Sequence, residues 1–227
     1  MKKATIILSV LVLTSSCNEK SIDNDQSLAL DRLTEICSMN NNELVASFNT
    51  ECLTINPFFH VGNKLDESLQ EIVKLHRTEK IKNEDLSTTL ISLIESKLPP
   101  ELTRLSDQGY TETESMFYSI ISNSILTDDI YTLNFRLSCI EDLILETDYF
   151  NFEAKKRLLV YCSVTKGVSN FLFQLSSEHK PETWDDCFRA KQQAMLDSGF
   201  IAKMSCVINW PLCLGIMAAD CALEQIT

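Results

Sequence analysis

Apolar residues recur at spacings of three and four along nearly the whole chain, and this pattern constrains the fold more than any other feature. Two segments show it plainly, with Leu65, Leu69, Ile72 and Val73 in one and Leu133, Leu137, Ile140 and Ile144 in the other. Such spacing gathers the apolar side chains on one face of an α-helix. The chain has only five glycines and five prolines, which leaves few positions for the tight turns of a many-stranded β fold. We therefore predict an all-α fold, a disulfide-stapled bundle of about eight to ten helices.

Local signals mark several of the expected helix ends. Thr111, with Glu114 three residues later, is typical of a capping box ahead of an apolar run. Pro181 opens the segment PETWDDCFRAKQQAML, which Ser198-Gly199 closes. We find no strand-like alternation after the first sixteen residues and no internal repeat. Residues 28–227 are thus expected to form one helical domain, in which residues 181–227 are a candidate cysteine-rich subdomain.

The N-terminus has the layout of an export signal. Met1-Lys2-Lys3 is followed by the uncharged stretch ATIILSVLVL and then by TSSC, which ends at Cys17. A basic start, a short apolar stretch and small residues before a cleavage point are typical of a secretory signal peptide. The apolar stretch is too short to cross a bilayer as a helix, which takes about 20 residues. We therefore predict that residues 1–16 are a signal peptide.

The sequence LTSSC, from Leu13 to Cys17, resembles the lipobox of bacterial lipoproteins. It departs from the usual pattern in one respect, because Leu13 lies four residues before the cysteine instead of three. The resemblance implies that Cys17 becomes the lipidated first residue of a mature chain held at the cell envelope. Asn18 after the cysteine implies the outer membrane in preference to the inner membrane. Residues 17–27 are polar and contain no aromatic residue, as expected of a flexible tether.

The chain is strongly acidic. Its 20 lysines and arginines and 32 aspartates and glutamates give a formal net charge of −12. Residues 1–16 contain two lysines and no acidic residue, so the predicted mature chain carries −14. Nucleic acid and anionic membrane surfaces would repel such a chain. We therefore expect contact with the membrane only through the lipid, no nucleic-acid partner, and a protein partner that is cationic.

Cysteine usage indicates disulfides. Nine cysteines are natural for an exported chain. With Cys17 assigned to lipid, an even number of eight remains: Cys37, Cys52, Cys139, Cys162, Cys187, Cys206, Cys213 and Cys221. No two cysteines have the two-residue separation of a zinc knuckle, and the three histidines lie far from them in the sequence. We predict four disulfides, no metal and no cofactor, although eight cysteines allow 105 connectivities.

Helix geometry suggests one of these pairs. Cys139 and Cys162 are each about eleven residues from Phe150–Asn151, where we expect a turn between two helices. An antiparallel helical hairpin would place both cysteines at the same height, and both lie on the apolar stripe of their helix. We therefore predict a Cys139–Cys162 disulfide.

The remaining pairs follow from the C-terminal break at Trp210-Pro211. Cys206 precedes Trp210 by four residues and Cys213 follows it by three, so a Cys206–Cys213 bridge would clamp the bend. This leaves Cys187 for Cys221, and Cys37 pairs with Cys52 by elimination. An exchange of partners between the two C-terminal bridges is the main alternative.

The segment MSCVINWPLCLGIMAAD, residues 204–220, carries no charge before its final aspartate. It is too short for a membrane span, and Asn209 and Pro211 interrupt it. We interpret it as a buried, stapled helical hairpin. A second interpretation is that the region from Cys187 to Thr227 is a releasable apolar peptide, because its composition resembles that of bacteriocin-like peptides cut from larger precursors.

No linear catalytic motif is present. The sequence lacks a G-x-S-x-G elbow, a phosphate-binding glycine-rich loop and an H-E-x-x-H helix. His60, His76 and His179 are scattered, and Asp185-Asp186 fits the first turn of a helix, where the dipole favours acids. We assign no catalytic residue and predict a lipid-anchored, non-enzymatic protein-binding module, such as an immunity or inhibitor protein. The alternatives are the peptide precursor and an enzyme whose site is assembled from scattered residues.

Overall fold

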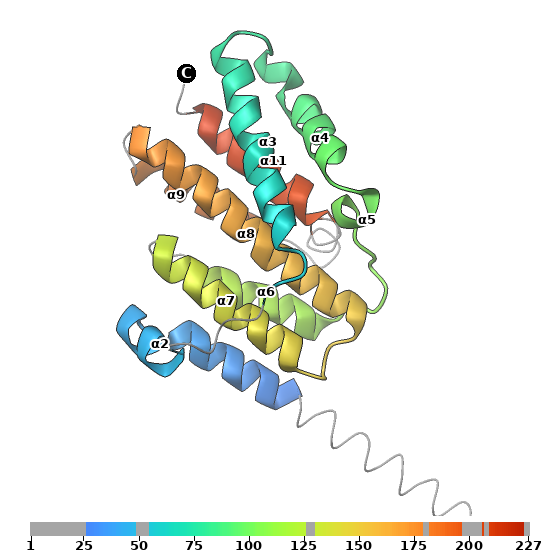
Figure 1. The fold of residues 1–227 in the computed structure, drawn as a ribbon, viewed down its shortest axis with the longest axis vertical. Coiled ribbons are helices and arrows are strands. Elements are labelled where there is room, and N and C mark those ends of the chain that lie inside the picture. The colour runs from blue at the N-terminus through green and yellow to red at the C-terminus, as the bar shows by residue number, and fades with distance from the viewer. Residues whose placement is uncertain are drawn as a thin grey trace, which may run out of the picture.

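The computed structural model describes residues 26–48, 55–125, 130–178, 182–196, 206 and 209–224. Every regular element within these residues is a helix, which confirms the predicted all-α fold (Figure 1). Residues 26–38 are helical and precede the labelled elements. These are α2 (Asn41–Phe48), α3 (Phe59–Arg77), the 3-10 turn η1 (Asn83–Asp85), α4 (Leu86–Lys97), α5 (Pro100–Thr103), α6 (Glu112–Ile125), α7 (Ile130–Glu146), α8 (Phe152–Glu178), α9 (Glu182–Leu196) and α11 (Trp210–Glu224).

Side-chain caps mark the starts of α2 and α6. Asn40 and Glu43 cap each other's backbone before α2, with both N···O distances at 3.0 Å. The amide of Glu114 donates to Thr111 Oγ1 at the start of α6 (3.2 Å). The second half of the predicted capping box does not form, because the Glu114 side chain turns into the core instead.

Helix α8 is the centre of the bundle. Helix α7 precedes it in an antiparallel hairpin whose turn spans residues 147–151, at the position predicted from the sequence. Helix α3 runs parallel to α8 and crosses it closely where Gly62 meets Ser163 and Gly167. A Cβ atom on Gly62 would overlap the Ser163 carbonyl, and one on Gly167 would overlap the backbone of Gly62. The Gly62 amide donates to the side-chain Oγ of Ser163 (2.9 Å), which adds a hydrogen bond between the two helices.

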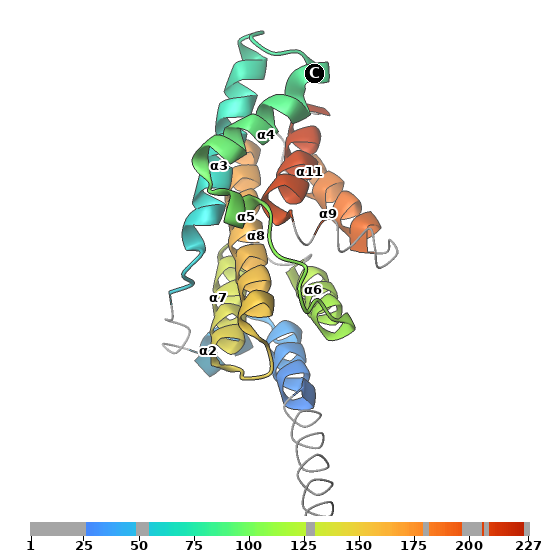
Figure 2. The ribbon, with the colours of Figure 1, turned by 90° about the vertical axis from the view of Figure 1, so that its right-hand side faces the viewer.

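Helix α11 lies inside the bundle and contacts α3, α4, α5, α8 and α9 (Figure 2). Trp210, Leu214, Ala218 and Ala222 are fully buried. Gly215 allows the close approach, since a Cβ atom there would lie 2.9 Å from Leu65 Cδ1. The described part of residues 204–220 is therefore a core helix of the bundle. Among the described residues, no helix is both long and apolar enough to cross a membrane.

Candidate functional site

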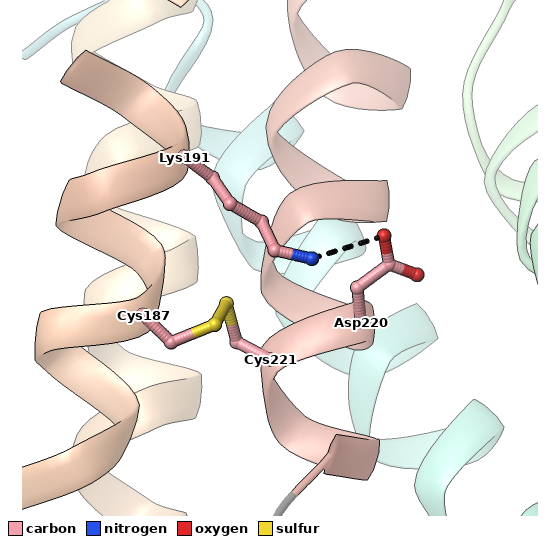
Figure 3. The surroundings of a disulfide bond; sticks show 4 residues. All are labelled: Cys187, Lys191, Asp220 and Cys221. Carbon is pink, nitrogen blue, oxygen red and sulfur yellow. Dashed lines mark hydrogen bonds and ion pairs between the residues drawn. A yellow bond between two sulfur atoms is a disulfide. The ribbon is translucent and has the colours of Figure 1, made fainter. Parts of the chain in front are cut away.

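Two disulfides fasten the C-terminal helices. Cys187 of α9 is bonded to Cys221 of α11, with their Cα atoms 5.7 Å apart, and Cys206 is bonded to Cys213 with Cα atoms 5.5 Å apart. Both pairings are those predicted from the sequence. Figure 3 shows Lys191 directed at Asp220 beside the first bridge, with Nζ 3.4 Å from Oδ2. The covalent and ionic links together hold α9 against α11.

The predicted Cys139–Cys162 bridge is wrong. Cys162 is a fully buried thiol, and Cys139 belongs to a disulfide whose partner lies outside the described residues. The two helices do form the expected hairpin, but equal height along a hairpin does not make two side chains face each other. The predicted Cys37–Cys52 pair involves a residue that the structure does not describe, and it stays a prediction. Cys52 and Cys17 both lie outside the described residues.

A buried polar cluster lies between α6 and α8. Glu114, Tyr118 and Ser122 are four residues apart on α6, and Arg157, Tyr161 and Thr165 have the same spacing on α8. We call these six residues the α6–α8 seam. All six side chains belong to residues that are at most 1% exposed.

The first rung of the α6–α8 seam is a bidentate ion pair. Arg157 Nε donates to Glu114 Oε1 (2.8 Å) and Nη2 donates to Oε2 (2.7 Å). The hydroxyl of Tyr118 donates to the same Oε1 (2.9 Å). Arg157 Nη1 also donates to the carbonyl oxygens of Ser106 and Gln108. Burial raises the pKa of Glu114 by more than its bonds to Arg157 and Tyr118 lower it.

Trp210 of α11 packs against the two tyrosine rings of the seam. Tyr118 and Tyr161 pack edge to face with ring centroids 5.0 Å apart, and Trp210 packs on both at 5.0 and 4.6 Å. Tyr161 OH shares a hydrogen bond with Ser122 Oγ (2.5 Å) and accepts one from Gln192 Nε2 of α9 (3.2 Å). Burial raises the pKa of Tyr161 far above its usual range. The seam and its contacts with Gln192 and Trp210 therefore hold α6, α8, α9 and α11 together. The ionisable groups of the seam serve these contacts between helices.

A second charged cluster joins α7 to α8. Lys166 Nζ donates to Glu141 Oε2 (2.6 Å) and to Ser138 Oγ (3.0 Å), and Asn56 Nδ2 donates to Glu141 Oε1 (2.7 Å). The thiol of Cys162 is buried beside this cluster. Burial raises its pKa well above the usual value, and the negative charge of Glu141 raises it further. A thiol in this environment stays protonated and is a poor nucleophile.

A groove of about 380 Å³ opens between the C-terminal parts of α3 and α8. It is lined by Gln70, Val73, Lys74, Arg77, Thr78, Phe171, Gln174 and Leu175. Gln70 Nε2 bonds Gln174 Oε1 across it (2.9 Å), and the Thr78 hydroxyl donates to the Lys74 carbonyl (2.9 Å). The described side chains of the lining include no carboxylate, histidine or cysteine, so among them the groove lacks the titratable pairs on which general acid–base catalysis depends.

The other residues considered from the sequence do not meet in one place. His60 and His76 lie on α3 sixteen residues apart, which separates them by about 24 Å along the helix. His179 lies outside the described residues, as do the side chains of Asp185 and Asp186. Within the described ranges, no three histidine, cysteine or carboxylate side chains are placed to hold a metal ion.

Comparisons with protein-family models, with curated proteins and with solved structures find no match to this chain.

Proposed function

We propose that this chain is a lipid-anchored protein of a bacterial cell envelope that binds a cationic protein partner and catalyses no reaction. The observation that supports the proposal is the distribution of charged side chains between the core and the exterior. Of the charged side chains that the structure describes, five are buried: Glu114, Arg136, Glu141, Asp142 and Arg157. Three are acidic and two are basic, so in the part of the chain that the structure describes the core holds an excess of only one negative charge, and the rest of the acidic excess lies on the exterior. Such an exterior accelerates and strengthens association with a basic surface.

The internal chemistry supports binding over catalysis. Arg157 neutralises Glu114, Lys166 neutralises Glu141, and the Cys162 thiol has a raised pKa inside the core. An enzyme uses such perturbed groups where substrate can reach them. Here they stabilise contacts between helices.

The position of α11 supports an intact domain over a peptide precursor. Release of the region from Cys187 onward would remove Trp210 from its packing against Tyr118 and Tyr161, and α11 from its contacts with five other helices. Apolar surface exposed in this way costs about 25 cal/mol per Å². The remaining chain would thus lose the centre of its core.

Affinity isolation from the native envelope tests the proposal. The tagged full-length protein, cross-linked in cells, is expected to retain a basic protein that a wash at about 0.5 M salt removes from the uncross-linked complex. A Cys17→Ser variant, which cannot be lipidated at this position, should be absent from the membrane fraction. If the salt wash does not remove the partner, the proposed electrostatic attraction is wrong. If no protein is retained at all, the proposed binding function is wrong.

A further inference from the structure

Three large apolar side chains are exposed at one end of the bundle. Leu28 is 60% exposed, Met116 is 50% exposed and Phe152 is 72% exposed. Leu28 lies near the start of helical residues 26–38, Met116 near the start of α6, and Phe152 is the first residue of α8. Figures 1 and 2 show these helix starts and the α7–α8 turn at the lower end of the molecule, where the described chain begins. We call this region the anchor-side end.

Direct contacts join the segments that carry these side chains. Gln26 Nε2 donates to Thr113 Oγ1 (2.8 Å), which links the first described turn to the first turn of α6. The Phe150 ring, next to the start of α8, packs edge to face on Phe117 of α6 with centroids 4.8 Å apart. The α6–α8 seam fixes the same part of α6 through Arg157. These contacts therefore fix the three segments of the anchor-side end relative to one another.

Helix register places Leu28 on the side of the α7–α8 turn. Arg32 lies one turn further along the same helix face as Leu28, and its Nη2 is 3.9 Å from Glu146 Oε2 at the end of α7. Because the two helices run antiparallel, Leu28 lies level with the residues that follow Glu146. Those residues lead directly to Phe152.

Carboxylates outnumber cations on the segments that carry the apolar side chains. The same segments carry Asp31, Glu112, Glu146, Asp148 and Glu153. The cations of these segments are Arg32, which faces Glu146, Lys155, whose Nζ donates to the Leu145 carbonyl (2.8 Å), Lys156, and the buried Arg157. The exterior of these described segments thus combines exposed apolar side chains with an excess of carboxylates.

We propose that the anchor-side end docks a basic amphipathic segment of the protein partner, an inference that rests on the proposed function and names its surface. An amphipathic helix places its apolar face on exposed apolar side chains while its flanking lysines and arginines meet the carboxylates. The same carboxylates would repel anionic lipid headgroups, and a second copy of this chain would bring like charges together. Charge complementarity therefore selects a basic polypeptide.

Site-specific photo-cross-linking in the full-length protein, in its native envelope, tests this surface. A photoreactive residue replaces Leu28, Met116 or Phe152 in turn, with Val45, Ile55 and Phe59 as controls that are also exposed apolar side chains. We expect the first three positions to cross-link one protein through a segment with apolar residues at helical spacing and a surplus of lysine and arginine. The controls should yield at least tenfold less product.

Variants that remove carboxylates test whether these groups attract the partner segment or only lie near it. Combining Glu112→Gln, Asp148→Asn and Glu153→Gln should lower the cross-link yield about tenfold, whereas Glu79→Gln, Asp85→Asn and Glu101→Gln should change it less than twofold. Cross-links to lipid, to a second copy of the chain or to a segment without a basic surplus would overturn the inference. If affinity isolation retains a basic partner but these positions do not cross-link it, the inference fails and the proposed function stands. If isolation retains none, both fail.

Discussion

Arg157 and Glu114 form a bidentate ion pair in which neither side chain is exposed to solvent. The pair joins α8 to α6 across 43 residues of sequence. Its arginine also binds the backbone of Ser106 and Gln108, so one side chain positions both the start of α6 and the segment before it. Breaking such a pair leaves a buried charge without its counter-ion, which costs more than the pair itself contributes.

Replacing one partner should therefore destabilise the protein strongly. We expect Glu114→Gln or Arg157→Met to lower the free energy of unfolding by about 3–5 kcal/mol, and the double variant to lose less than the two single losses added together. Urea denaturation followed by circular dichroism measures this. Arg104→Met, at an exposed salt bridge with Glu95, is the matched control and should change stability by less than about 1 kcal/mol. Additive losses in the double variant would contradict the coupling.

The raised pKa of Glu114 predicts a pH dependence. A carboxyl whose folded pKa lies above its usual value of 4.5 binds protons more tightly in the folded state. Its contribution to stability is complete below the unfolded pKa and is lost as the pH rises through the folded pKa. The free energy of unfolding should thus fall more steeply with pH above about 4.5 in the wild type than in Glu114→Gln. If the free energy of unfolding instead rises more steeply with pH in the wild type, Arg157 lowers the pKa of Glu114 by more than burial raises it.

The two C-terminal disulfides should differ in their effect on stability. On the chain-entropy model, the Cys187–Cys221 bridge, with a sequence separation of 34, contributes about 4 kcal/mol. The Cys206–Cys213 bridge, with a separation of 7, contributes about 2.5 kcal/mol. Thermal unfolding of Cys187→Ala/Cys221→Ala and of Cys206→Ala/Cys213→Ala compares them. A larger loss from the second pair would mean that clamping the Trp210-Pro211 bend matters more than loop length.

The Cys162 thiol should resist alkylation in the folded protein. It is fully buried, and its raised pKa keeps the reactive thiolate rare at pH 8. Iodoacetamide at this pH should leave Cys162 unmodified until denaturant is added, as peptide mass mapping would show. Rapid modification without denaturant would mean that α7 and α8 separate readily, and a disulfide at Cys162 would contradict its assignment as a thiol.

The sequence predicts those features that depend on local pattern. Apolar spacing predicts the helices, and the break at Trp210-Pro211 predicts the C-terminal clamp because its cysteines are neighbours in the chain. The predicted Cys139–Cys162 pairing is wrong because an apolar face spans a wide arc of the helix. Two cysteines on facing apolar stripes can therefore point in different directions. Sequence spacing gives the height of a cysteine but not the direction of its Cβ atom.

The α6–α8 seam is the main feature that the sequence analysis misses. Glu114 looks like a capping residue, and Arg157 stands in a run of cations, KKR, that resembles a solvated face. A signal was nonetheless present, since acid, tyrosine and serine on one helix match arginine, tyrosine and threonine on another at the same four-residue spacing. Only the tertiary arrangement shows that these two stripes face each other.

The measurement that tests the central claim most directly is the intact mass of the protein isolated from its native envelope, before and after reduction. We predict a chain that begins at lipidated Cys17, retains the region from Cys187 onward and gains about 6 Da on reduction, two hydrogens for each of the disulfides at Cys139, Cys187 and Cys206. A chain without lipid at Cys17 would contradict the anchor. A chain that lacks the region from Cys187 onward would instead make that region a released peptide.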